Sequence, residues 1–198
     1  MSNERIIGLY ERHAAAWDRQ RGRDMHEKPW LDRFLALIPP GASILDIGCG
    51  MAEPVAAYLL ECGHAVTGID SSRSLIAMAR ERFPTQQWIV ADMRALDLNR
   101  RFDALLAWHG FFHLSPDDQR PMFARFAAHA KPGAPLMFTS GCAQGETIGA
   151  WQGEPLYHGS LDPAGYRTLL EENGFELIAH VERDPHCGES TVWLAVRT

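Results

Sequence analysis

Residues 43–54 have the sequence SILDIGCGMAEP. An apolar run ends in a Gly-x-Gly turn, and a helical pattern begins directly after Pro54. Proline is well tolerated in the first turn of a helix, because the backbone N–H that it lacks would have no partner there. This order of strand, loop and helix is typical of a nucleotide-binding α/β unit, in which glycines let a ligand approach the backbone closely.

A second motif follows the next predicted strand. Residues 65–69 are apolar and are followed by Asp70. In nucleotide-binding units a carboxylate roughly 20 residues after the first glycine binds the hydroxyls of a ribose. We therefore expect a ribose site at Asp70. The alternative is that the glycines only form a tight turn and that Asp70 only caps a helix.

Position 53 argues against the pyrophosphate of a dinucleotide. The fingerprint Gly-x-Gly-x-x-Gly requires glycine there, whereas the chain has Glu53. A carboxylate beside a helix N-terminus repels a pyrophosphate, and Asp46 adds a second negative charge. The pocket therefore suits a nucleoside without phosphate and with a positive charge. S-adenosylmethionine (SAM), which combines adenosine with a sulfonium and an ammonium, has these properties.

Three motifs in this order resemble the class I SAM-dependent methyltransferases, in particular the branch that acts on small molecules. They are Asp46-x-Gly48-x-Gly50, Asp70, and Ala91-Asp92-Met93 after a third predicted strand. The resemblance extends over nearly the whole chain and is most specific at residues 44–108. Many relatives have a third glycine where this chain has Ala52, and we expect the alanine to take a negative φ.

The resemblance implies an α/β fold of the Rossmann-like, doubly wound type. Its seven-stranded sheet is mostly parallel, ends in an antiparallel C-terminal hairpin and carries helices on both faces. We expect a single domain over residues 1–198. Its expected parts are an N-terminal helical cap at 1–40, a cofactor-binding core at 41–140, a substrate lid at 141–161, and a C-terminal helix and hairpin at 162–198.

The two regions that flank the core give different sequence signals. Residues 4–20 repeat apolar side chains at helical spacing, which predicts one helix with Tyr10 and Trp17 on a packing face. Residues 140–161 have no regular periodicity and are rich in glycine. Long irregular segments in compact domains are usually functional or disordered, and the aromatic residues argue against disorder. We therefore expect an irregular lid over the substrate.

The resemblance also implies roles in binding the cofactor and its product, S-adenosylhomocysteine (SAH). Asp46, Gly48 and Gly50 would shape the methionine end of the site, and the carbonyl of Ala107 would accept from the ammonium. Asp70 would bind the ribose, and Ser71, Asp92 and Met93 would line the adenine side. Trp17 and Arg21 would fold over the cofactor. Arg21 would pair with the methionine carboxylate, although a solvated run of charges explains this segment equally well. Core packing is the alternative role of Met93.

Methyl transfer is a displacement at a sulfonium carbon, so orientation can lower much of the barrier without a nucleophilic side chain. His109 is the candidate proton acceptor, because an unperturbed imidazole has a pKa of about 6.5. His109 and His113 have a metal-binding spacing, but Gly110 and the lack of a third ligand argue against a metal site. The expected substrate contacts are His109, His113, Trp151, Tyr157 and His158. For each of the three histidines, a packed or hydrogen-bonded loop residue is the alternative.

Composition limits the partners and the compartment. A hydrophobic content of 46% and a charged content of 22% are ordinary for a soluble globular protein. The net charge of −6 disfavours nucleic acid as a partner. The four cysteines form no C-x-x-C pair, and no signal peptide or membrane-spanning run is apparent. We expect a cytoplasmic monomer or homodimer that does not bind membranes.

The function that these observations favour is transfer of a methyl group from SAM to a small-molecule acceptor, at an O, N, S or C atom. An NAD(P)-type oxidoreductase shares the fold but needs a pyrophosphate site. Methyltransferases for nucleic-acid or protein amides usually carry an Asn/Asp-Pro-Pro-aromatic run after strand four, where this chain has Trp108-His109-Gly110-Phe111. A non-catalytic SAM-binding regulator is a further alternative, for which no lid would be expected.

Overall fold

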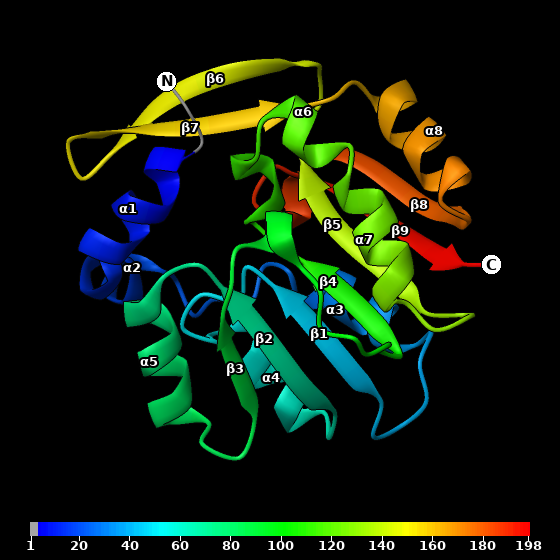
Figure 1. Ribbon diagram of the computed structural model, residues 1–198, viewed down its shortest axis with the longest axis horizontal. Coiled ribbons are helices and arrows are strands. Elements are labelled where there is room, and N and C mark those ends of the chain that lie inside the picture. Colours follow the sequence, from blue (N-terminus) through cyan, green and yellow to red (C-terminus); the bar gives the residue numbers. More distant parts are fainter. Residues whose placement is uncertain (1–3) are drawn as a thin grey trace.

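A computed structural model describes residues 4–198, which form one seven-stranded sheet and a separate two-stranded hairpin (Figure 1). The strand order of the large sheet is β3-β2-β1-β4-β5-β9-β8. The first five of these strands are parallel, whereas β9 is antiparallel to both of its neighbours. The strands are β1 (Ser43–Ile47), β2 (Ala65–Asp70), β3 (Gln87–Val90), β4 (Ala104–Ala107), β5 (Pro135–Ser140), β8 (Phe175–Asp184) and β9 (Ser190–Arg197). The predicted fold class is confirmed.

Helices cover both faces of this sheet because its strands are apolar on both sides. Ile44 and Leu45 are neighbours in β1, and their side chains enter opposite core clusters. The cluster around Ile44 includes α3 (Lys28–Leu35), α4 (Val55–Glu61) and α5 (Arg73–Arg82). The cluster around Leu45 includes α7 (Met122–His129) and α8 (Pro163–Glu172). The remaining short helices are α6 (Pro116–Gln119), η1 (Met93–Ala95), η2 (Phe111–His113) and η3 (Pro185–Cys187).

The sheet order places the site. Chain connections run outward in both directions from β1 and β4, so the loops after these two strands diverge at one edge of the sheet. Open α/β sheets bind ligands at such a switch point, beside the carboxyl ends of the strands. The Gly-x-Gly turn follows β1, and Trp108 and His109 follow β4.

The N-terminal segment differs from the single helix expected at 4–20. The chain forms α1 (Glu4–Arg12) and α2 (Ala14–Gln20), because His13 leaves the helical conformation with φ −110° and ψ 18°. Both helices lie beside the carboxyl ends of the central strands rather than on a face of the sheet (Figure 1). They are positioned to cover what binds there.

The irregular lid expected at 141–161 is corrected by the structure. This region contains a β-hairpin of β6 (Gly145–Trp151) and β7 (Glu154–Ser160), paired from Gly145↔Ser160 to Trp151↔Glu154. Gln152 and Gly153 form the turn with φ values of +53° and +75°. Two consecutive left-handed residues are characteristic of a type I′ hairpin turn. The alternation was not visible in the sequence because β6 is exposed along nearly its whole length.

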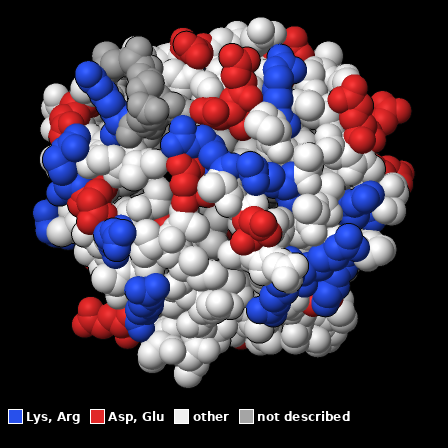
Figure 2. Space-filling view, in the orientation of Figure 1, with Lys and Arg blue, Asp and Glu red and all other residues white. Residues whose placement is uncertain are grey.

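Charged residues of both signs are interspersed on the face shown in Figure 2. Over residues 4–198, none of the helices combines the length and the apolar character needed to cross a membrane.

The contact between the start of α5 and helix α1 can be tested by mutation. Ser72 is fully buried; its hydroxyl accepts a hydrogen bond from Leu75 N at 3.2 Å and donates one to Glu11 of α1 at 2.6 Å. Because an N-cap contributes about 1 kcal/mol, Ser72→Ala should lower the free energy of unfolding by about 1–2 kcal/mol in urea denaturation. Ser74→Ala is the matched control, since Ser74 also donates to Glu11 but does not cap α5. Equal losses in both variants would contradict the capping role.

Candidate functional site

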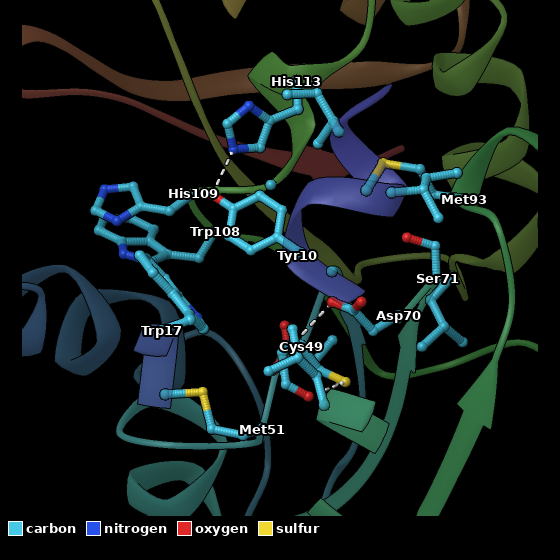
Figure 3. Close-up of a pocket in the computed structure, with 18 of the residues that line it drawn as sticks. Tyr10, Trp17, Cys49, Met51, Asp70, Ser71, Met93, Trp108, His109 and His113 are labelled. Atoms are coloured by element: carbon cyan, nitrogen blue, oxygen red, sulfur yellow. Dashed lines mark hydrogen bonds between the residues drawn. The ribbon is translucent and has the colours of Figure 1, made fainter. Parts of the chain in front are cut away.

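A pocket opens at the carboxyl ends of β1 to β4 and is covered by α1 and α2 (Figure 3). The structure therefore brings together nearly all residues for which a cofactor role was expected. The lining includes Tyr10, Trp17, Arg21, Asp46, Gly48, Gly50, Asp70, Ser71, Asp92, Met93, Trp108, His109 and His113. Ala107 lies behind this surface, fully buried in β4.

The Gly-x-Gly turn forms the floor of the pocket. Gly48 and Gly50 have φ values of +79° and +55°, which favour glycine. A Cβ atom on Gly48 would lie 3.4 Å from Met93 Cε and 3.6 Å from Gly110 Cα. Ala52 also takes a positive φ, of +70°. The negative φ expected for this alanine is therefore wrong.

Two carboxylates lie side by side at this floor. Asp70 ends β2 and accepts hydrogen bonds from Gly50 N at 3.0 Å and Ser72 N at 2.8 Å. Burial raises the pKa of Asp70, and these backbone donors oppose the rise. Asp46 in β1 is only 3% exposed and receives no offsetting hydrogen bond from residues 4–198; burial and the nearby Asp70 raise its pKa to about 7.

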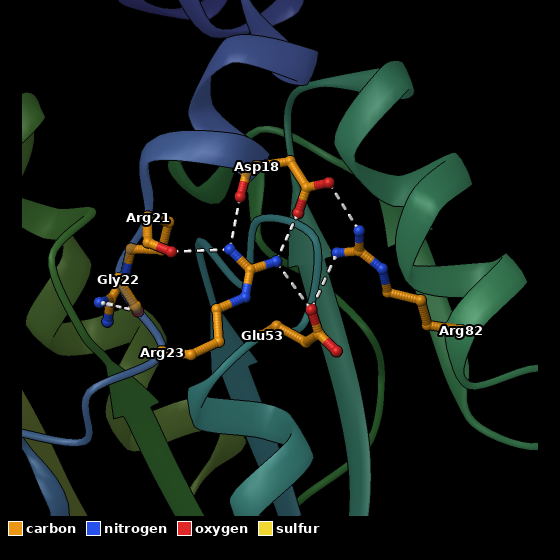
Figure 4. Close-up of polar contacts among 6 residues, drawn as sticks. All are labelled: Asp18, Arg21, Gly22, Arg23, Glu53 and Arg82. Carbon is orange, nitrogen blue, oxygen red and sulfur yellow. Dashed lines mark hydrogen bonds and ion pairs between the residues drawn. The ribbon is translucent and has the colours of Figure 1, made fainter.

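Glu53 does not supply the unpaired negative charge that the sequence suggested. Its carboxylate lies 2.9 Å from Arg23 and 3.4 Å from Arg82 (Figure 4). Asp18 of α2 pairs with the same two arginines, at 2.7 Å each. Glu53 is therefore part of an ionic network that joins the cap to α5, and the repulsion of a pyrophosphate depends on Asp46 and Asp70.

The side of the pocket next to β3 carries Asp92 and Met93. Burial alone would raise the pKa of Asp92, but hydrogen bonds from Arg94 outweigh it and keep that pKa below its usual value. The Arg94 guanidinium lies 2.6 Å from Asp92 Oδ2. Asp92 is therefore an ionised acceptor at the pocket wall, next to the thioether of Met93.

The cap supplies Trp17 from α2 and Arg21 from the residue directly after it. The indole nitrogen of Trp17 lies 3.7 Å from the position that a Cβ on Gly50 would occupy. The guanidinium of Arg21 donates to the buried carboxylate of Glu27 and to Gly22 O at 3.0 Å. These contacts hold Arg21 at the pocket wall and leave further N–H groups for a ligand.

His109 has an environment that the sequence did not reveal. Its φ is +53°, its backbone N–H donates to Thr139 Oγ1 at 3.0 Å, and its Nε2 lies 3.0 Å from Ser190 Oγ. Burial, with a smaller contribution from Arg21, lowers the pKa of His109 to about 4. The unperturbed pKa assumed from the sequence is therefore wrong, because this ring is packed between Trp108 and Phe112.

Tyr10 is one of several pocket-lining residues that were not among the site residues expected from the sequence. Its hydroxyl lies 3.0 Å from His113 Nε2, and His113 Nδ1 lies 2.8 Å from the carbonyl oxygen of Tyr157. Helical spacing had indicated only a packing face for Tyr10. The one available signal was that Tyr10 shares this face with Trp17, for which a role at the cofactor was expected.

The remaining expected substrate residues lie in the hairpin, outside the pocket lining. Trp151 packs against Tyr10 and Trp17, with ring centroids 5.5 Å and 5.7 Å away. The ring of His158 lies 5.0 Å from that of His113. The hydroxyl of Tyr157 points to Glu146 at 2.8 Å. These hairpin residues thus do not line the pocket themselves, and Trp151 and His158 contact residues that do.

Cap and hairpin also bind each other directly. The carboxylate of Glu154 forms an ion pair with Arg12, and its Oε1 lies 2.7 Å from His13 Nε2. Trp151 Nε1 donates to Gln20 Oε1 at 2.9 Å. The two covers, which are more than 120 residues apart in the sequence, are thus joined by direct contacts.

Comparisons with known proteins agree with this geometry. Residues 44–133 match the family described as "Methyltransferase domain". An O-methyltransferase of Pyrenophora dematioidea is 27% identical over 159 residues, covering 74% of this chain and 59% of the relative. The malonyl-[acyl-carrier protein] O-methyltransferase of Salmonella typhimurium is 28% identical over 158 residues, covering 77% of this chain and 60% of the relative. The chain thus spans about three fifths of the length of these relatives.

Among solved structures, the magnesium protoporphyrin IX methyltransferase of Synechocystis with bound SAH matches with a TM-score of 0.76. The alignment covers 99% of each chain at 17% identity. The resemblance to the class I SAM-dependent methyltransferases is thereby confirmed. Residues 44–133 match the methyltransferase-domain family in sequence, and the described chain shares its fold with a solved methyltransferase structure.

The raised pKa of Asp46 predicts how stability depends on pH. A carboxyl group with a folded pKa of about 7 and an unfolded pKa of about 3.9 favours the folded state while it stays protonated. This contribution is complete below pH 4, is lost as the pH rises through 7, and amounts to a few kcal/mol.

Asp46→Asn should therefore become more stable relative to the unmodified protein as the pH rises from 4 to 8. Urea denaturation of the ligand-free proteins at several pH values measures this difference. A difference independent of pH would show that Asp46 is ionised throughout.

Proposed function

We propose that this protein transfers a methyl group from SAM to a small-molecule acceptor. The observation that supports this most directly is the pair of Asp46 and Asp70 beside the glycine floor at the switch point of the sheet. One carboxylate is buried without a partner, and the other is held by two backbone N–H groups.

The donors and acceptors of the pocket fit SAM. Burial makes the ionised form of Asp46 costly, and a nearby cation such as an ammonium relieves this cost. Each oxygen of Asp70 accepts one backbone hydrogen bond, which leaves lone pairs for two ribose hydroxyls. A dinucleotide pyrophosphate would instead face two carboxylates. The proposal thus favours SAM over NAD(P).

The remaining contacts are assigned by their place in the pocket. The backbone of Gly48 and Gly50 would line the methionine end. Ser71, Asp92 and Met93 would line the adenine side, and Trp17 and Arg21 would close over the cofactor, with Arg21 at the carboxylate.

SAM supplies a methyl group on a good leaving group, so the chain contributes mainly by orienting the reactants and excluding water. The cap and the hairpin provide the cover, with residues 141–161 as the substrate lid of a single domain. His109 is our candidate proton acceptor. Its neutral imidazole can accept a proton at pH 7, and its pKa of about 4 places any acidic limb of the rate well below neutral pH.

The name of the structural neighbour that acts on magnesium protoporphyrin IX supports a small acceptor. Both curated relatives described above are O-methyltransferases, and the protoporphyrin methyltransferase shares the fold. We further propose a cytoplasmic monomer or homodimer whose partner is the small-molecule acceptor rather than nucleic acid or a membrane.

Calorimetry with SAM, SAH and NADH tests the cofactor. Charge-assisted hydrogen bonds to two ribose hydroxyls together contribute about 2–4 kcal/mol, so Asp70→Ala should weaken SAM binding roughly 30-fold or more. Asp97→Ala, at an exposed loop carboxylate, is the matched control and should bind as the unmodified protein does. Tighter binding of NADH than of SAM would overturn the proposed function.

Hydrogen exchange tests the cover. Because the hairpin packs on the cap rather than in the main sheet, its amides should exchange faster than those of β5 and β9 in the ligand-free protein. Saturating SAH should slow exchange across residues 145–160 and leave β5 and β9 unchanged. Slow exchange that does not respond to SAH would identify a fixed structural element.

A further inference from the structure

Tyr10 and His113 form a pair that joins the cap to the loop after β4. The Tyr10 hydroxyl lies 3.0 Å from His113 Nε2, inside the pocket (Figure 3). His113 is 7% exposed and also contacts the Tyr157 carbonyl through Nδ1 at 2.8 Å. Both of its ring nitrogens are thus engaged, one by the cap and one by the hairpin.

These two contacts fix the position of every proton in the pair. A backbone carbonyl oxygen only accepts hydrogen bonds, so His113 Nδ1 must carry the proton in that contact. Burial lowers the pKa of His113 to about 4, and the ring is neutral at pH 7. A neutral imidazole has one N–H, so Nε2 has a lone pair and accepts from Tyr10. Tyr10 must therefore be the donor.

The Tyr10 oxygen then has only lone pairs left for the pocket. The phenol has a single proton, and His113 Nε2 holds it. Burial also raises the pKa of Tyr10, so the hydroxyl stays protonated. The ring cannot easily turn away, because Trp17 and Trp151 pack against it with centroids 5.4 Å and 5.5 Å away.

We propose that the oxygen of Tyr10, oriented by His113, selects methyl acceptors that present an O–H or N–H to this end of the pocket. The inference rests on the proposed function and deepens it by naming the acceptor class. A hydroxyl or amine donates to Tyr10, whereas a carboxylate or ether oxygen would face lone pairs without a proton between them. A buried site built for a hydrogen-bonding partner discriminates strongly against ligands that lack one.

The surrounding side chains indicate the shape of such an acceptor. Trp17, Trp108 and His109 line the pocket near this pair. Aromatic walls favour flat, largely apolar molecules. Phenol and anisole are therefore suitable probes: both are flat, and they differ in whether the oxygen carries a hydrogen.

Ligand-observed NMR titrations of phenol and anisole, in protein saturated with SAH, measure the selectivity. The unmodified protein should bind phenol roughly tenfold more tightly than anisole, the effect of one buried hydrogen bond. Tyr10→Phe should bring the ratio close to one with SAH affinity retained. Tyr58→Phe is the matched control, because it removes a hydroxyl that bonds Asp32 outside the pocket, and it should keep the preference for phenol.

His113→Phe supplies the second arm. It removes the acceptor and leaves the Tyr10 hydroxyl free to donate into the pocket, so the preference for phenol should fall or reverse. A purely structural role of His113 would weaken both probes equally. If phenol has no advantage in the unmodified protein, including the case in which neither probe binds, the proposal is wrong.

Nitrogen-15 NMR of histidine-labelled protein tests the proton assignment without any variant. His113 should carry its proton on Nδ1, and a proton on Nε2 would overturn the inference. Failure of the protein to bind SAM or SAH would instead overturn the proposed function, so the two failures are distinguishable.

Discussion

The crowding of two carboxylates at one edge of the sheet is the constraint on which the site depends. The parallel register aligns Asp46 of β1 with Gly68 of β2, so that Asp70 lies only two residues further along the neighbouring strand. Backbone N–H groups compensate Asp70, but burial leaves Asp46 uncompensated. Two like charges in a poorly solvated pocket repel each other. The ligand-free protein reduces this repulsion by keeping Asp46 partly protonated, and a cationic ligand would remove it.

This constraint also accounts for the loop that follows β1. The backbone N–H of left-handed Gly50 donates to Asp70, and this contact places no side chain in the pocket. The same turn leaves an open floor, because a side chain on Gly48 would contact Met93 and Gly110. Residues 48–50 therefore contribute both to the binding surface and to the compensation of Asp70.

Features determined by local chemistry could be predicted from the sequence. The strand ending in Gly-x-Gly, the carboxylate after the second strand and the position of Met93 each depend on a few neighbouring residues. Because parallel strands end at the same edge of a sheet, these short motifs were enough to predict that their residues would lie together. The sheet and most of the expected cofactor contacts follow from this rule.

Features determined by distant contacts could not be predicted. Tyr10 contacts His113, which is 103 positions away in the sequence. The pKa of His109 depends on burial by segments that no local pattern specifies. Glu53 looked like a free charge because its partner Arg82 comes from another helix. The hairpin was missed because β6 buries almost nothing, and the main signal was its turn at 152–153.

The contacts between the cap and the hairpin affect how ligands enter and leave the pocket. Glu154 holds Arg12 and His13, and Trp151 holds Gln20, so neither cover can lift without breaking contacts to the other. The cap and the hairpin would therefore have to move together to open the pocket. Release of SAH, binding of SAM and binding of the acceptor would then all depend on the same opening motion. The lifetime of the closed state would limit the rate of each of these steps.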